Sequence, residues 1–350
     1  MSKQDQARRT AVEITFDGAD ITKDIKPYLL SVSYTDNEED AADDLQIKIQ
    51  DRDVVWQQSW LEKAIQAAAA GKLKFSAVIK PEGWGDDAVL PTGDFELDSI
   101  EPTGPPAEIA IKGTALPFSA PVRQTKKSKA WESYNLSGIA NEIAGNAGMT
   151  CMYEASNDPF YRRVEQVKAS DIDFLSRLCH NAGISLKITD NMLVLFDQKD
   201  YEGKGPVFTI KRGSGKYIKY KLGTGAADTQ YGSCRVSYTD PGSGKCIEGT
   251  YTASGEDAKS GQRLEIRARV ADASEAKTLA EKNLRLHNKF TRTASFTLPG
   301  NTALVSGVTV MLEGWGGWDG KYIIKQAKHT VDGSGGYTTQ IVVRRALEGY

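Results

Sequence analysis

The sequence predicts a β-rich α+β protein in which two similar sheet-forming domains flank a small α/β middle domain. Strand-like alternation of apolar and polar residues dominates both ends of the chain, whereas two amphipathic helical stripes lie in its middle. The chain has 350 residues with 40% hydrophobic content, which suits two or three domains with separate cores.

The first domain is expected over residues 1–121 and consists mostly of sheet. Strands are predicted at Val12–Phe16, Leu45–Ile49, Phe75–Lys80 and Gly93–Ile100. One helix is predicted over residues 53–70, because Asp53 suits a helix N-cap and Gly71 suits a helix stop. The proline-rich residues 101–106 break regular strand pairing, and the domain ends at the prolines that follow them.

The middle domain is expected over residues 122–204, with two helices packed on a small sheet. Apolar stripes predict the helices over residues 135–148 and 170–183. Ser170 lies three residues before Asp173, which is a variant of the capping box at the start of the second helix. A hairpin and a flexible link complete the domain, at residues 184–196 and 201–205.

The last domain is expected over residues 205–350 and is again mostly sheet, with one helix capped by Asp272 or Ser274. Strands are predicted at residues 207–211, 217–222, 233–238, 246–251, 264–270, 293–298, 308–313, 321–328 and 338–344. Both outer domains share the order strand, aspartate, single helix, strand. At an offset of 219, Leu45 matches Leu264 and Asp53 matches Asp272, which favours a tandem pair of related domains.

Composition excludes several classes of function. Lys and Arg total 44 against 46 Asp and Glu, so no overall positive field exists to bind nucleic acid, and no sequence-specific nucleic-acid partner is expected. The longest apolar run is Met192–Phe196, far shorter than the roughly 20 residues of a membrane-spanning helix. The N-terminus lacks the apolar stretch of a Sec signal peptide, so synthesis in the cytoplasm is expected.

No catalytic, cofactor-binding or metal-binding residue is predicted. The cysteines Cys151, Cys179, Cys234 and Cys246 have no zinc-like spacing and are expected to be reduced. A hairpin between Cys234 and Cys246 would set them opposite Thr250 and Tyr238, so they would not form a disulfide. The three histidines, His180, His287 and His329, lie in three different elements, and no phosphate-binding loop or nucleophile elbow is present.

Four polar or aromatic clusters have both a functional and a structural interpretation. Asp171 and Asp173 could form an acid–base pair, but in the first turn of a helix they ordinarily favour its positive dipole end. Trp315 and Trp318 are interpreted as covering a barrel end or a subunit contact rather than as a carbohydrate platform. The charged runs are interpreted as solvated surface, with a channel wall or docking patch as the alternative, at Asp36, Glu38, Glu39, Asp40, Asp43 and Asp44 and at Arg123, Lys126, Lys127 and Lys129.

Two groups of motifs resemble those of a known family. Ala169–Leu178 followed by Asn181–Ile184 resembles the D-x-D-F-L-x-R-L … G signature of the phage late control D family, the tail hub proteins. The family's closing barrel is similar in order and spacing to Ala294–Asn301, Gly307–Val310, Asp319–Tyr322, His329 and Gly336–Thr339. The resemblance covers the chain from about Ala130 to its end, and the first third only in its order of elements.

This resemblance implies a structural, non-enzymatic homotrimer in the baseplate of a contractile tail or tail-like particle. Each subunit would contribute two similar barrel-like tube domains, each with one helix, so that a pseudo-sixfold ring joins the sixfold tail tube to the threefold central spike. Expected partners are the tail tube or tube-initiator protein, the central spike protein and other baseplate proteins, with a tape measure protein as a further candidate. No cofactor is expected.

Two other functions stay open at this point. The family includes the hub part of the valine-glycine-repeat spikes of type VI secretion, so a secretion spike that delivers an effector is one alternative. We expect no oligonucleotide-fold domain after Tyr350, and this expectation favours a separate spike protein instead. The other alternative is a tail component that binds or degrades peptidoglycan, since the middle domain has the size of a small carbohydrate-binding module.

Overall fold

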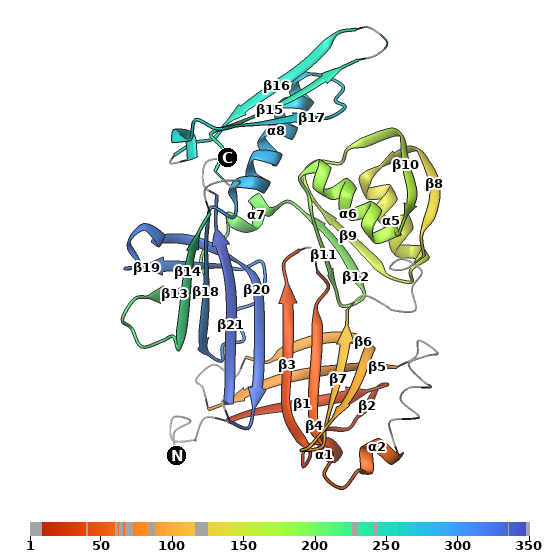
Figure 1. Cartoon of the computed structure of the whole chain (residues 1–350), viewed down its shortest axis with the longest axis vertical. Coiled ribbons are helices and arrows are strands. Elements are labelled where there is room, and N and C mark those ends of the chain that lie inside the picture. The colour runs from red at the N-terminus through yellow and green to blue at the C-terminus, as the bar shows by residue number, and fades with distance from the viewer. Residues whose placement is uncertain are drawn as a thin grey trace.

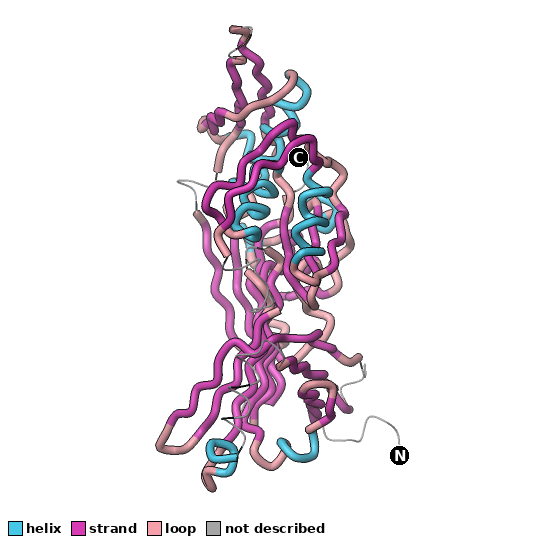
Figure 2. Tube along the Cα trace, turned by 90° about the vertical axis from the view of Figure 1, so that its right-hand side faces the viewer, coloured by secondary structure: helices cyan, strands magenta, loops and turns pink. Residues whose placement is uncertain are grey.

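Most strands of the protein join one large sheet that runs through its lower and central parts (Figures 1 and 2). The structure is a computed structural model, and it describes residues 9–347 except 40, 60–61, 63–65, 67–72, 84–87, 116–124, 226–229, 241, 243, 256 and 335. The predicted β-rich α+β class is confirmed by this model and by its likeness to solved structures given below. The sheet consists of two units that join edge to edge, and two lobes are attached to it.

The first sheet unit follows the predicted alternation of buried and exposed residues. Its strands are β1 (Arg9–Phe16), β2 (Ala19–Asp20), β3 (Leu29–Asn37), β4 (Asp44–Gln50), β5 (Lys74–Glu82), β6 (Leu90–Thr103) and β7 (Glu108–Thr114), with short helices α1 (Thr22–Ile25) and α2 (Val55–Ser59). Leu45, Ile47 and Ile49 of β4 are fully buried and pack in one core with residues of β1, β5 and β7. This inward-facing set is what a half-buried strand requires.

The second sheet unit has its own core, which includes Phe296, Ile324 and Ile341. Its elements are β13 (Phe208–Lys211), β14 (Lys219–Thr224), β18 (Arg292–Pro299), β19 (Thr309–Glu313), η3 (Gly316–Trp318), β20 (Gly320–Asp332) and β21 (Gly336–Arg345). The first half of β20 pairs with β19, and its second half pairs with β3 of the first unit. The β3–β20 pairing is the junction that makes the two units one sheet.

The two units share one order of strands. The first runs β1-β5-β6-β7-β4-β3, and the second runs β13-β19-β20-β21-β18-β14, which is the same order along the chain. Corresponding core residues also face each other in the same way, since Ile47 pairs with Ile111 and Phe296 pairs with Ile341. One pairing differs: β1 is antiparallel to β5, whereas β13 is parallel to β19. Closure of each unit into a barrel stays a prediction.

The predicted offset of 219 between the units was wrong. Leu45 lies in β4 of the large sheet, but Leu264 lies in β17 (Arg263–Arg267), an edge strand parallel to β15 (Ser233–Thr239) in a separate sheet. In β4 and β18 the corresponding core residues are Ile47 and Phe296. Because a segment is inserted between β14 and β18, Ile47 and its counterpart Phe296 lie more than 219 positions apart along the chain.

This insertion forms an upper lobe, and the helix predicted for the last domain belongs to it. The lobe contains β15, β16 (Cys246–Thr252), η2 (Asp257–Lys259), β17 and α8 (Ala273–Asn288), and it lies at the top of Figure 1. Ala276, Ala280 and Leu284 of α8 are fully buried in a core with residues of β15. A Cβ on Gly249 of β16 would approach the Lys277 nitrogen at 2.4 Å, so glycine allows close packing there. This helix was expected within the second tube domain, but it lies outside the second sheet unit.

The middle lobe confirms the two predicted helices but has two small sheets instead of one. Its elements are β8 (Lys127–Asn135), α5 (Leu136–Asn146), β9 (Thr150–Glu154), β10 (Phe160–Ala169), α6 (Asp171–Ala182), β11 (Ser185–Thr189), β12 (Met192–Phe196) and α7 (Gln198–Glu202). Ser170 accepts a hydrogen bond from Asp173 N, and Gly183 ends α6 in the left-handed conformation, as predicted. The flexible link predicted over residues 201–205 starts inside helix α7, whose cap Asp197 accepts a bond from Lys199 N.

Several local predictions fail because of longer-range contacts. Asp51, not Asp53, accepts hydrogen bonds from the first turn of α2, and much of the predicted helix over residues 53–70 lies outside the described residues. Pro102 does not break β6, since it pairs with Ile109 of β7. The hairpin register places Cys234 opposite Tyr251 and Cys246 opposite Thr239, one residue from the prediction, and all four cysteines are free. The predicted domain end near residue 121 lies outside the described residues.

Candidate functional site

The acidic residues at the end of β3 are the most distinctive polar feature of the structure. They were predicted to form a solvated loop, and this was wrong for Asp36, Glu38, Glu39 and Asp43, which are each at most 6% exposed. Asp44 is exposed at the start of β4. Asp40 lies outside the described residues. Pairing of β3 with β20 brings the buried carboxylates into contact with both sheet units, the middle lobe and the segment after α8. We call the polar contacts around them the junction network.

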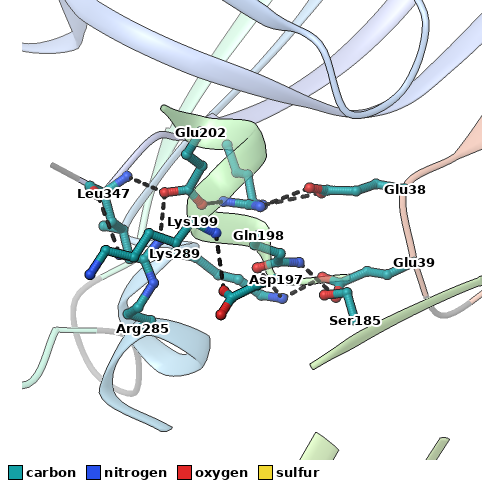
Figure 3. A network of polar contacts seen from close by, with 11 residues as sticks. Glu38, Glu39, Ser185, Asp197, Gln198, Lys199, Glu202, Arg285, Lys289 and Leu347 are labelled. Atoms are coloured by element: carbon teal, nitrogen blue, oxygen red, sulfur yellow. Dashed lines mark hydrogen bonds and ion pairs between the residues drawn. The ribbon is translucent and has the colours of Figure 1, made fainter. Parts of the chain in front are cut away.

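Arg344 of β21 is the centre of the junction network. Its Nη2 and Nε donate to the two oxygens of Glu38 at 2.8 and 3.2 Å, and its Nη1 donates to Glu202 of α7 at 2.6 Å. The other oxygen of Glu202 accepts from Arg285 Nη2 at 2.8 Å and from Leu347 N at 2.9 Å. Burial opposes the charge of Arg344, but Glu38 and Glu202 hold its pKa above the usual value. Figure 3 shows Glu38 and Glu202 on opposite sides of the guanidinium group that both carboxylates contact.

Glu39 forms the second part of the junction network. One of its oxygens pairs with Lys289, and the other accepts from Ser185 Oγ at 2.7 Å and from Gln198 Nε2 at 2.8 Å. Burial raises the pKa of Glu39, but Lys289 more than offsets this effect and holds it below the usual value. This carboxylate therefore links β3 to the middle lobe and to the loop after α8.

Asp36 and Asp43 share one lysine at the edge of the same region. Lys187 of β11 binds Asp36, and its Nζ lies 3.8 Å from Asp43. Ser306 donates to both oxygens of Asp36 at 2.7 Å, through its N and its Oγ. Burial raises the pKa of Asp43 to about 7, with Lys187 opposing this rise and the neighbouring carboxylate of Asp36 adding to it. These contacts connect the first sheet unit, the middle lobe and the second sheet unit.

His329 lies in the β3–β20 pairing itself and is fully buried. Its Nε2 donates to the carbonyl of Leu304 at 3.1 Å, so its Nδ1 accepts from the hydroxyl of Tyr337 at 2.9 Å. Burial lowers the pKa of His329 to about 4. Its ring stacks on Tyr34 of β3 with a centroid distance of 6.2 Å. The neutral ring is therefore a packed part of the junction.

The chemistry of this region suits attachment between parts of the chain. The carboxylates of Glu38, Glu39 and Glu202 each pair with a cation, so each is held by a contact between distant parts of the chain. Within the described residues, no group of three or more His, Cys, Asp or Glu side chains is placed to hold a metal ion. Removal of one partner from such a buried pair typically costs about 3–5 kcal/mol, so the network strongly resists separation of the lobes.

The other predicted candidates have structural contacts. Asp171 is buried and accepts from Lys127 Nζ at 2.6 Å and from Gln166 Nε2 at 2.8 Å, so it is an anchored helix-start residue. Lys129 of the same basic run pairs with Glu142, while Arg123 lies outside the described residues. No helix of the described chain is both long and apolar enough to cross a membrane.

The two tryptophans pack against the second sheet unit. Trp315 is 3% exposed and donates to Ile210 O at 2.8 Å, so its ring cannot serve as a platform for a sugar. Trp318 donates to Gly223 O of β14 at 3.2 Å. The indoles thus bond to two strands of the second sheet unit, β13 and β14.

Sequence reasoning missed the basic half of the junction network. Arg344, Arg285 and Lys289 were not singled out, since no local motif marks a single basic residue in a strand or helix as buried. One local signal was available. Arg344 follows the buried Val343 near the end of β21, a strand in which every second residue is buried. The contact of Arg344 with Glu38 spans 306 positions in the chain, so no local pattern could identify the partner.

Comparison with known proteins gives consistent sequence matches. The family model described as phage tail baseplate hub matches residues 114–335, which is more than half of the chain. The probable baseplate hub protein of Escherichia phage 186 is 24% identical over 224 residues, covering 63% of this chain and 54% of that protein. The corresponding protein of Escherichia phage P2 is 27% identical over 213 residues, covering 58% and 50%. The chain thus spans about half the length of the curated relatives it matches.

Solved structures show the same fold at lower sequence identity. The tail protein from Neisseria meningitidis MC58 aligns with a TM-score of 0.69 at 13% identity, covering 96% of this chain and 97% of that chain. A chain of the lidded Francisella PdpA–VgrG complex aligns with a TM-score of 0.60 at 10% identity, covering 98% of this chain and 53% of that chain. The likeness extends across the sheet units and both lobes.

Proposed function

Because the chain belongs to the phage tail baseplate hub family, we propose that three copies of it form a ring that joins the tail tube to the central spike. The ring is a structural part of the particle and not an enzyme. The names of the phage 186 and P2 relatives as probable baseplate hub proteins support this role. The buried ion pairs of the junction network also suit a structural subunit, because they hold distant parts of the chain together.

The observation that carries the proposal is the shared strand order of the two sheet units. Three chains with two corresponding units each offer six similar surfaces to a sixfold tube. The same three chains retain threefold contacts for a spike. Such an arrangement needs a repeated edge-to-edge contact between units, and the β3–β20 pairing is one such contact within the chain.

The expected partners follow from this position in the particle. They are further copies of the chain, the tail tube or tube-initiator protein, the central spike protein and other baseplate proteins, with a tape measure protein as a further candidate. A chain of similar fold forms part of the Francisella PdpA–VgrG complex, which supports binding of another protein by this fold. Synthesis would take place in the bacterial cytoplasm, followed by assembly into the baseplate.

The decisive test is electron cryomicroscopy of intact particles together with the mass of the complex that contains this chain. The proposal expects three copies in a ring between tube and spike, with two similar densities from each chain. Six copies in the ring, or a position away from the tube axis, would disprove it. A peptidoglycan release assay with the purified chain is expected to show no activity, and release that depends on Asp171 or Asp173 would support the wall-degrading alternative.

A further inference from the structure

β6 and β20 occupy the same place in the two sheet units, and in both the pairing with the neighbouring strand, β5 or β19, ends partway along. Leu97 N of β6 donates to Leu73 O at 3.1 Å, and Ile324 N of β20 donates to Val308 O at 2.9 Å. Each bond reaches the residue just before the neighbouring strand, β5 or β19. A bulge follows at once in both strands. The second halves of β6 and β20 are therefore counterparts.

Only one of these two halves is paired on its outer side in the described chain. Gln326–Asp332 of β20 pairs antiparallel with Ser31–Asn37 of β3. Ser99–Thr103 of β6 pairs with β7 but, among the described residues, with no strand on the other side. β14, the counterpart of β3, likewise pairs with β18 alone within the described ranges. The chain thus has one filled junction and the two separate halves of a second one.

We propose that β14 of one copy pairs antiparallel with Ser99–Thr103 of β6 in the next copy, so that the β3–β20 junction is repeated between chains. This inference rests on the proposed ring, in which three junctions within chains alternate with three junctions between chains. Figure 1 places β14 and β6 at opposite sides of the sheet, as a head-to-tail contact requires. The occupant of each open edge is therefore a second copy of this chain.

The register of the new junction follows from the filled one. Val32 of β3 faces the core residue Ile47 of β4, and Tyr220 of β14 faces its counterpart Phe296 of β18. The next residue along each strand is Ser33 or Lys221, so these two correspond. Thr330 of β20 corresponds to Thr103 of β6, because both lie five residues after the bulge. Ser33 faces Thr330 within the chain, and their hydroxyl oxygens are 3.4 Å apart. Lys221 should therefore face Thr103 of the next copy.

The backbone of β14 is oriented for this pairing. Gly225 N donates to Thr291 O at 3.1 Å, so that residue is directed inward, toward the chain's own sheet. Alternation along the strand then directs the N–H and C=O groups of Leu222 and Thr224 outward. In the inferred register Leu222 faces Pro102, whose carbonyl can accept a bond but which has no N–H to donate. The junction between chains therefore has one hydrogen bond fewer than its counterpart.

Charge favours this pairing over pairing of identical edges. β14 exposes Lys219 and Lys221, whereas the open part of β6 exposes Glu101, a carboxylate that also pairs with Lys112 of β7 at 2.7 Å. Two β14 strands side by side would bring lysines together, and such charges and prolines on an edge strand oppose uncontrolled association. The inferred register instead sets Lys221 diagonally opposite Glu101, within reach of a long side chain. Opposite charges then select β6 as the partner of β14.

Cysteine pairs in the full chain test the register directly. Thr103→Cys with Lys221→Cys, in a Cys246→Ser background that removes the exposed native thiol, should convert the monomer band into covalent multimers that end at a closed trimer. Ser33→Cys with Thr330→Cys is the matched positive control, because the corresponding pair lies within one chain and should close without multimers. Glu101→Cys with Lys219→Cys is the negative control, because a slip of four residues separates these positions by about 13 Å.

The cross-linking is read after mild oxidation of the assembled complex, on a non-reducing gel, beside its mass measured without oxidation. A trimer by mass that gives no cross-link between 103 and 221 would overturn the strand junction and leave the hub function standing. Cross-linked open chains without a closed trimer would support the strand junction and contradict the proposed ring. A chain that neither assembles nor cross-links would contradict both. Equal cross-linking of the negative control would show that the register is wrong.

Discussion

The filled β3–β20 junction and the open edge of β14 are built on corresponding strands, but their surroundings differ. β3 is followed by Glu38 and Glu39, which are buried and paired with cations from other parts of the chain. β14 is followed by the sequence Gly225-Ala226-Ala227-Asp228, which has no such pair of glutamates. The contact within the chain is therefore fixed by buried charges, whereas the edge available to another copy has solvent-exposed lysines. This difference suits a subunit that folds first and assembles afterwards.

The largest expected effect concerns the buried cation of the filled junction. Arg344→Met should lower the free energy of unfolding by about 3–5 kcal/mol, because Glu38 and Glu202 would be left as buried charges without this partner. Urea denaturation followed by circular dichroism measures this change. The matched control is Arg163→Met, since Arg163 also pairs with two glutamates but its side chain is 60% exposed. Equal effects of the two substitutions would show that the junction network does not hold the units together.

The second prediction concerns the pH dependence of the filled junction. The pKa of His329 is about 4 in the folded chain and near 6.5 when unfolded, so below pH 6.5 the unfolded chain binds the extra proton. Its contribution to stability is therefore complete above pH 6.5 and is lost as the pH falls toward 4, by about 3 kcal/mol. His329→Gln should remove this component of the pH dependence.

The measurement is the difference in unfolding free energy between the natural chain and His329→Gln at several pH values. Because the carboxylates titrate in both proteins, the difference isolates the histidine. The advantage of the natural chain should shrink from pH 7 to pH 4. His180→Gln, at an exposed histidine, is measured beside His329→Gln as the control for replacing a histidine by glutamine. A difference that stays constant with pH would contradict the assignment of a neutral, buried His329.

The contrast between local and long-range features explains what the sequence could predict. Ser170 and Gly183 were correctly identified as the ends of α6, because a cap and a stop act on residues within one helical turn. The carboxylates of Glu38 and Glu39 look like those of a solvated loop until their cations are known, and these come from segments distant in the chain. Burial of charge therefore could not be inferred without the fold.

The relation of the two sheet units shows the same limit. Their strand order is alike, but the upper lobe is inserted between β14 and β18 and has no counterpart between β3 and β4. As a result, no single offset aligns the units, and the offset of 219 matched strands with different roles. Few side chains are shared even at true counterparts, as Ile47 and Phe296 illustrate. What the units retain is the order of backbone pairing, which is only visible in the structure.

The smallest expected effect concerns the open edge. Lys221→Glu should weaken assembly by about threefold per junction, because it sets two carboxylates near each other across the inferred contact. Adding Glu101→Lys should restore assembly, since the charges are then exchanged, and salt should reduce both effects by screening exposed charges. Sedimentation velocity across a concentration series measures the change. Weakening by Lys221→Glu that Glu101→Lys deepens instead of reversing would place Glu101 away from β14, and the two edges would then have different partners.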